Sequence, residues 1–358
     1  MAVDTHMANL SNGLLVVALL AYSLAVLGFA GDFAFGRRRG QSRIAAQAKA
    51  PALARVGAAG SGEQAAAADD PAADQPGRDG IGEDRSASGI VTVLSGPGAE
   101  PKSRPGAWVR AALAATLVGL AAHLAGVVAR GLAVHRLPWG DMYEFVVALT
   151  CVAVIFFIGL MIKYRANYLG LFVIGAVVVA LGLAQTLIYT AAGPLVPALQ
   201  SYWLSIHVTA ITLAVGTYFV AAVLGIVYLL ADRYRRRVAA GRATGAAGIM
   251  RRLPAPEVLD RLAYRTVMFA FPIWTFGIIA GAIWADQAWG RYWGWDPTET
   301  WAFITWVVYA CFLHARATAG WRGRKAAVVQ LIGFCCLVFN MVGVSLFITG
   351  LHSYAGLS

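Results

Sequence analysis

Long apolar segments separated by short polar connections dominate this chain, and they limit the folds that it can adopt. Candidate membrane spans are residues 10–35, 107–129, 144–162, 168–188, 202–230, 266–285, 300–314 with a short extension, and 326–349. With 59% hydrophobic and 13% charged residues, the 358-residue chain resembles membrane proteins in composition rather than soluble domains. Backbone groups inside lipid must bond within their own segment, which favours helices. We therefore predict an all-α polytopic membrane protein with about eight transmembrane helices.

The basic residues predict the orientation of these helices. If the connection 36–106 is cytoplasmic, the inner connections carry the clusters Arg37–Arg39, Lys163 with Arg165, Arg233–Arg237, and Arg322–Lys325. The outer connections then carry only Arg130, Arg136 and Arg291. Since cytoplasmic loops are enriched in Lys and Arg, both termini are predicted on the outer face of a bacterial plasma membrane. This distribution also explains the net charge of +11 without a nucleic-acid partner.

Three regions follow along the sequence. Residues 1–36 hold the first transmembrane helix, which we predict is retained, because its apolar run is long and no basic residue precedes it. Residues 37–106 lack aromatic side chains and are rich in Ala, Gly, Asp and Pro, which predicts a disordered cytoplasmic loop. Residues 107–358 form the main membrane domain. Within it, "LPAPEVLDRLAYRTV" (253–267) predicts a short amphipathic helix at the membrane surface before the sixth span.

Histidines are the main candidates for functional groups, since ionisable side chains inside membrane spans are rare and usually functional. His123 lies in the second span and His314 near the inner end of the seventh. His207 lies near the outer end of the fifth span, and His352 follows the eighth. The predicted topology therefore places His207 and His352 on the outer side and His314 deeper, which indicates two sites at different depths.

The segment "WGRYWGWDPTETW" (289–301) concentrates tryptophan on the same outer side. Six of the eleven tryptophans lie between Trp284 and Trp306. Tryptophans are common as interfacial anchors, but an anchoring belt would be spread over all outer helix ends. The end of the segment, "DPTET", predicts a helix start with Thr298 as N-cap and Asp296 in the preceding turn.

Two imidazoles beside an aromatic wall favour haem over a bare metal ion. Zinc sites use about four ligands, whereas haem iron needs only one or two axial ligands from the protein. The four cysteines lie in apolar runs and form no CxxC pair, which excludes a dithiol redox centre of the chain's own. Arg130, Arg136 and Arg291 are candidates for contacting propionates, with contacts to lipid headgroups as the alternative.

The motif "WGRYWGWDPTETWAFITW" resembles the WWD signature of the haem-handling protein family. The segments "PWGDMYEF", "LQSYWLSIHV", "CFLHARATAGWRGRKAA" and "GLHSYA" are similar to its CcsA/ResC branch, labelled CcsB in actinobacteria. That branch is the membrane component of System II cytochrome c maturation. The resemblance runs from Trp108 to the C-terminus and implies a haem-handling domain over 107–358, with a WWD loop at 286–301.

The resemblance implies particular roles for these residues. His207 and His352 would bind the iron of an outer haem b, and the WWD segment would cover the ring, with Trp289, Trp293, Trp295, Asp296 and Trp301 as cofactor-binding residues. His314 would bind the iron of a haem within the membrane. Its second ligand is either His123 or a residue of a partner subunit.

The implied function is that of the membrane component of a System II cytochrome c synthase. It would present haem on the outer face and support thioether attachment to the CxxCH motif of apocytochrome c. The implied partners are a ResB/Ccs1-type membrane subunit, apocytochrome c and a thiol-reducing thioredoxin-like protein. The alternatives are a System I-type haem delivery or haem lyase protein, a haem-bearing electron-transfer subunit, and a transporter without cofactor.

Overall fold

The computed structural model describes residues 3–35, 106–194, 199–242, 250 and 253–352, and it is helical throughout these ranges apart from short connections. The predicted disordered loop, 37–106, lies outside the described residues apart from Gly106. The helices are α1 (Thr5–Phe35), α3 (Ala107–Val134), α4 (Met142–Tyr164), η2 (Asn167–Leu169), α5 (Gly170–Leu187), α6 (Tyr202–Ala239), α8 (Pro256–Trp289), α9 (Pro297–Thr318), α10 (Arg324–Val338), η4 (Phe339–Gly343) and α11 (Val344–Phe347). The described residues contain no strand, so the all-α prediction is confirmed.

Within the described ranges, seven helical segments are long and apolar enough to cross a membrane. They correspond to the predicted spans one to six and eight. The predicted seventh span, 300–314, lies within α9, which is helical over 22 residues but is not one of the seven. Polar and charged side chains at both ends of α9, including Glu299 and Arg316, lower its hydropathy. The chain is therefore a multi-pass membrane protein.

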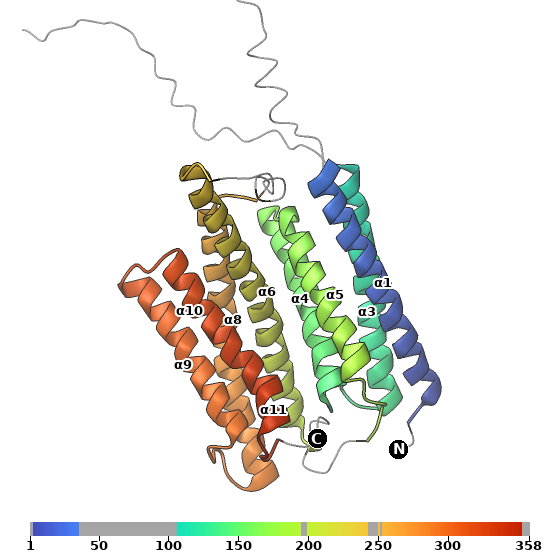
Figure 1. Ribbon diagram of the computed structural model, residues 1–358. Coiled ribbons are helices and arrows are strands. Elements are labelled where there is room, and N and C mark those ends of the chain that lie inside the picture. Colours follow the sequence, from blue (N-terminus) through green and yellow to red (C-terminus); the bar gives the residue numbers. More distant parts are fainter. Residues whose placement is uncertain (1–2, 36–105, 195–198, 243–249, 251–252, 353–358) are drawn as a thin grey trace, which may run out of the picture. The chain divides into compact units, whose positions relative to one another are not determined.

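The helices pack in two groups that α4 connects (Figure 1). Helix α1 lies along α3 and also contacts α5, whereas α6 lies along α8 and contacts α10, which in turn lies beside α9. Helix α4 contacts α3, α5 and α6. The first group has a buried core that includes Tyr22, Phe29 and Phe157. The second has Trp274, Tyr218 and Tyr309 at its centre, and it carries most of the candidate site.

Two local predictions differ from the structure. The stretch 253–267 does not form a separate surface helix, because from Pro256 onward it is the beginning of α8, which continues without interruption to Trp289. Burial of Leu259, Leu262 and Ala263 against the other helices explains this continuity. The connection between α8 and α9 is also shorter than the predicted loop, since only residues 290–296 lie outside the two helices.

One end of the helical unit brings distant parts of the sequence together. Figure 1 shows the start of α1, the connection between α8 and α9, and α11 at the same end. A backbone bond from Asp4 N–H to the carbonyl of Ala133 ties the N-terminal segment to the end of α3 there. The ends of α6 and α9 that carry Arg236, Arg237 and Arg316 lie at the opposite end. This arrangement has the predicted pattern, and which end faces outward stays a prediction.

Candidate functional site

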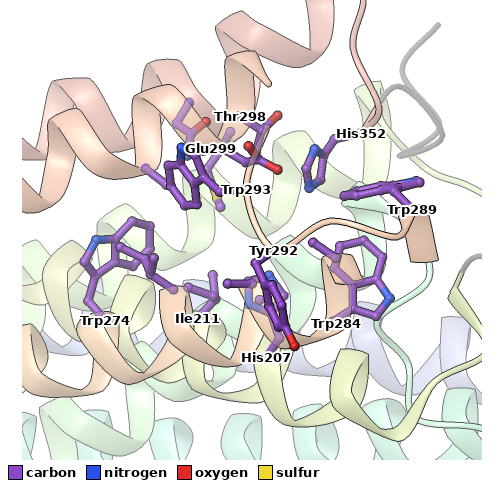
Figure 2. A pocket seen from close by; sticks show the side chains of 17 residues that line it. His207, Ile211, Trp274, Trp284, Trp289, Tyr292, Trp293, Thr298, Glu299 and His352 are labelled. Carbon is purple, nitrogen blue, oxygen red and sulfur yellow. The ribbon is translucent and has the colours of Figure 1, made fainter. Parts of the chain in front are cut away.

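Two small cavities meet at His207 and His352. The first has a volume of about 110 Å³, and its lining includes both histidines with Trp284, Trp289, Trp293 and Asn340. The second, of about 160 Å³, extends toward Trp139 and Asp141. Both cavities share His207, Ile211, Trp284, Thr298, Asn340, Met341 and His352. The histidines therefore lie at the junction of two lobes, and Figure 2 shows their side chains with the aromatic residues around the first lobe.

His207 is held by the backbone of the neighbouring helix. Its Nδ1 lies 2.8 Å from the carbonyl oxygen of Gly277 in α8. A carbonyl only accepts hydrogen bonds, so Nδ1 carries the proton and Nε2 of the neutral ring keeps the lone pair. Gly281 permits this position, because a Cβ there would lie 2.6 Å from the imidazole. This is the hydrogen-bonding arrangement that orients histidines toward metals.

His352 is held in the same tautomer by a carboxylate. Its Nδ1 lies 2.8 Å from Oδ1 of Asp296, and the side chain is 25% exposed. Since an ionised carboxylate only accepts, Nδ1 is the donor here too, and the pair matches the carboxylate–histidine arrangement of metal sites. Helix α6 and the segment after α11, which are far apart in sequence, thus bring the two histidines to the same region. In each histidine, Nδ1–H already donates a hydrogen bond.

Asp296 fixes the C-terminal segment, residues 348–352, to the start of α9. Its Oδ2 accepts from Leu351 N–H at 2.7 Å, and its Oδ1 accepts from Thr298 N–H at 3.1 Å. Gly350 permits this approach, because a Cβ at that position would lie 2.6 Å from Oδ2. Burial of Asp296 opposes its ionisation, but hydrogen bonds from the His352 side chain, Leu351 N–H and Thr298 N–H lower its pKa to about 2.

The predicted N-cap of α9, Thr298, is wrong by two residues. Asp296 is the N-cap, Pro297 occupies the first helical position, and Glu299 completes a capping box. Glu299 Oε2 accepts from the N–H groups of Gly294 and Asp296, at 2.8 Å and 3.2 Å. Asp296 rather than Thr298 caps the helix, because its carboxylate accepts hydrogen bonds from both the helix start and the C-terminal segment.

Trp284 joins the two histidines into one aromatic cluster. Its ring is stacked on that of His207 with centroids 6.0 Å apart, and its centroid is also 6.0 Å from that of His352. Trp289 lies edge-on to His352 at 5.1 Å and to Trp284 at 4.8 Å. The sequence analysis did not single out Trp284 as a site residue, although its place within the tryptophan-rich region was a usable signal.

The tryptophans of the motif differ in their positions. Trp289 and Trp293 line the first cavity. Trp295 is 64% exposed, lies edge-on to Trp293, and lines neither cavity described above. Its φ of 55° is in the left-handed region, which is strained for a bulky residue. Trp301 packs against Phe339 at 4.4 Å, so its contact is with the helix beside the cavities.

Asn340 is a lining residue that the sequence analysis missed. It is 3% exposed, lines both cavities, and its Oδ1 has no hydrogen-bond partner within the described part of the chain. It lies in the π-helical segment η4, and such segments are frequent at functional sites. An asparagine inside the apolar run 326–349 was the signal that could have identified it.

The remaining predicted histidines lie elsewhere and apart from each other. His123 is fully buried in α3, where its ring nitrogens contact Tyr22 Oη at 3.3 Å and the carbonyl of Val147 at 3.0 Å. His314 is exposed on α9. Figure 1 places α3 and α9 in the two different helix groups. The structure therefore does not pair His123 with His314.

Two of the three arginines predicted on the outer side, Arg130 and Arg136, belong to a buried ion cluster. Arg130 Nε and Arg136 Nη1 donate to the two oxygens of Glu144, at 2.9 Å and 2.8 Å. Burial and the neighbouring Glu144 carboxylate raise the pKa of Asp141, the N-cap of α4 beside this cluster, to about 6. The cluster ties α3 to α4 next to the second cavity, whereas Arg291 is exposed in the connection after α8.

Comparison with known proteins identifies similar sequences. Residues 139–352 match the model of a family described as cytochrome C assembly protein. The chain is 37% identical over 238 residues to the cytochrome c biogenesis protein CcsA of Guillardia theta, covering 62% of this chain and 77% of the relative. It is 41% identical over 178 residues to the CcsA of Parasynechococcus marenigrum, covering 46% and 58%.

A solved structure shares the fold. It is the cytochrome c haem lyase CcmF, with a TM-score of 0.54 and 16% identity over the whole of this chain. This chain spans half the length of that protein.

Proposed function

Since the chain belongs to the cytochrome c assembly protein family, we propose that His207 and His352 are the residues that would hold haem iron during cytochrome c maturation. The proposal is carried by one observation, namely that both imidazoles have the same tautomer, with the proton on Nδ1. Each donates its Nδ1 proton to a fixed acceptor, so each keeps the Nε2 lone pair that iron requires.

The rest of the site fits a haem in its chemistry. The histidines lie at the junction of two cavities, which matches the need of a porphyrin to extend on both sides of its iron. The lining is mainly aromatic and aliphatic, as a flat apolar ring requires. Both cavities are smaller than the roughly 300–1,000 Å³ of typical cofactor pockets, so haem binding requires the site to open.

The segments around the site differ in how they can open. His207 belongs to α6 and bonds to α8, two helices packed along their length. His352 lies in the short segment after α11, where His352 and Leu351 both bond to the side chain of Asp296. We propose that haem enters by displacement of the C-terminal segment, with Trp289 and Trp293 on the ring and Trp295, Asp296 and Trp301 supporting the wall.

The proposed activity is catalysis by positioning. Bound haem supplies vinyl groups that react with the thiols of a CxxCH motif. The two imidazoles would hold the haem in place, the aromatic wall would exclude water, and the histidine of the apocytochrome would compete with one of the two imidazoles. We propose haem b as the cofactor, System II as the pathway, the outer face of the plasma membrane as the location of the site, and a ResB/Ccs1-type subunit and a thiol-reducing protein as partners.

The direct test is the absorbance spectrum of the full-length protein purified from a haem-producing host. We expect a bis-histidine Soret and α-band spectrum, which the double variant His207→Ala/His352→Ala loses. His6→Ala is the matched control, since this histidine lies in the first turn of α1 and is exposed. Equal haem content in the double variant and the control would contradict the outer site.

For the intramembrane site, we propose His314 as an iron ligand and exclude His123 as its partner. His314 is exposed on α9, so a second iron ligand there has to come from a partner subunit. His123 is not proposed as that ligand, because both of its ring nitrogens contact groups within this chain. The test is co-purification with the membrane partner: His314→Ala should lower the haem content of the complex while leaving that of the isolated chain unchanged.

A further inference from the structure

A third cavity lies at the end of the helical unit opposite to the histidines. Its volume is about 960 Å³, within the range of ligand-binding pockets. The end of α6, the first turns of α8 and the connection between α9 and α10 form its walls, with five arginines and three carboxylates among the lining residues. The haem proposal uses none of these residues.

The three carboxylates of the cavity are already paired. Arg316 donates to both oxygens of Asp260, at 2.8 Å and 3.0 Å. Arg235 donates to both oxygens of Glu257, at 2.8 Å and 2.9 Å. Arg236 pairs with Asp232 one helical turn away. An incoming anion therefore meets no unpaired carboxylate from this lining set.

One of these pairs gives the cavity a fixed wall. The side chains of Arg316 and Asp260 are only 9% and 13% exposed. The guanidinium of Arg316 lies over the ring of Tyr264 at 4.5 Å from its centroid, and Asp260 also accepts from Gly323 N–H at 3.2 Å. Three segments are thus joined by one buried ion pair, so the cavity has a defined shape.

Two arginines of the cavity are left over after this pairing. Arg261 and Arg322 line it, both are exposed, and within the described ranges neither has an ion pair with a carboxylate. Five arginines against three carboxylates leave an excess of two positive charges. A pair of guanidinium groups provides forked donors that match the oxygens of a phosphate.

We propose that this cavity binds a phosphate group, with Arg261 and Arg322 as its principal ligands. The cavity lies at the end of the membrane helices that carries the basic connections, where anionic lipid headgroups gather around basic pockets between helices. The same chemistry suits a phospholipid headgroup and a small soluble phosphate, and the experiment separates these two sources.

The test compares variants of the full-length protein in nanodiscs of phosphatidylcholine alone and of phosphatidylcholine with phosphatidylglycerol in equal parts. Native mass spectrometry measures phosphatidylglycerol retention, and thermal denaturation measures the shift in Tm. We expect Arg261→Gln/Arg322→Gln to weaken retention about tenfold to a hundredfold and to abolish the Tm shift. The control Arg233→Gln/Arg237→Gln removes the same charge from α6 outside the cavity lining and should retain both responses.

A second arm adds inorganic phosphate to the protein in a neutral detergent. A rise in Tm that depends on Arg261 and Arg322 identifies soluble phosphate as a ligand, whereas no rise together with a phosphatidylglycerol response identifies the lipid. Equal responses of the two double variants in both arms would overturn the proposal. If the double variant unfolds, Arg322→Gln alone decides the matter, because this residue lies in the connection after α9 and has an exposed side chain.

Discussion

At the scale of single residues, the carboxylate of Asp296 accepts hydrogen bonds from three parts of the site. It caps α9, accepts from the backbone of the C-terminal segment, and fixes the tautomer of His352. A neutral side chain of the same shape can imitate one or two of these contacts but lacks the charge that strengthens all of them. The aspartate of the motif is therefore explained by the position of His352 rather than by a contact with a ligand of its own.

We expect Asp296→Asn to lower haem affinity of the purified protein by about tenfold to a hundredfold, the usual cost of losing a partner of a metal-bound histidine. The matched control is Asp286→Asn, in the last turn of α8 and outside the lining of both cavities around the histidines. Haem titration followed by absorbance gives the affinities. Equal affinities for the two variants would show that the carboxylate does not orient His352.

The pKa of Asp296 also gives a pH dependence. Because the folded-state pKa of about 2 lies below the ordinary value of 3.8, the stabilising contacts are complete above about pH 4 and are lost as pH falls toward 2. Amide hydrogen exchange at Leu351 in the haem-free protein measures this, after correction for the intrinsic rate. Protection should persist from neutral pH to about pH 4. Loss of protection already near neutral pH would contradict this assignment.

The π-helical segment η4 is the element that the site depends on most. A π turn places an extra residue in the helix, and here it turns Asn340 toward both cavities just before α11 and the segment with His352. An amide buried without a partner for its oxygen lowers stability by about 1–3 kcal/mol. Such a residue is retained where a ligand uses it.

We expect Asn340→Leu to separate stability from haem binding. Replacing the buried amide with an apolar side chain of similar size should leave the free energy of unfolding of the haem-free protein unchanged or raise it by about 1 kcal/mol, while haem content falls. The control for haem content is Asn12→Leu on α1, whose Oδ1 is also buried without a partner, whose Nδ2 donates to Tyr189 Oη, and which lines neither cavity. Haem content that does not change in Asn340→Leu would show that the amide serves no ligand.

For the whole molecule, the division into two helix groups separates structural histidines from candidate ligands. His123 belongs to the group of α1, α3, α4 and α5, where Tyr22 and Val147 satisfy it. His207 and His352 belong to the region of α6, α8 and the segment after α11. Their places along the predicted spans do not show whether a partner within the chain already satisfies both ring nitrogens, and the hydrogen-bond partners in the structure do.

We expect His123→Ala to lower stability and to leave the haem spectrum of the proposed His207–His352 site unchanged. Loss of a fully buried side chain with two polar contacts should cost about 2–4 kcal/mol. By contrast, His207→Ala should lose haem and should lower thermal stability less than His123→Ala does. Denaturation of both haem-free variants and spectra of both haem-loaded variants provide the comparison. A shifted iron spectrum in His123→Ala would restore this residue as a ligand.

Much of the fold was predictable because hydropathy and turn residues are local signals. The positions of seven apolar helices and the grouping of His207, His352 and the tryptophans at one end followed from them. The continuity of α8, the N-cap at Asp296 and the role of Asn340 did not, because each depends on packing against distant segments. Whether His123 or a partner subunit supplies the second ligand beside His314 was left open, because the contacts of a buried side chain cannot be read from its position in a span.

The two histidines of the site have unequal supports. His207 is bonded to a helix that packs along its own helix, and its removal from the site would require α6 and α8 to separate. His352 follows the short helix α11, and the side chain of Asp296 accepts from its Nδ1 and from the N–H of Leu351. Of two iron ligands so arranged, we expect His207 to be the permanent one and His352 the exchangeable one. An apocytochrome histidine would therefore replace His352, and the product would leave while His207 is still in place for the next haem.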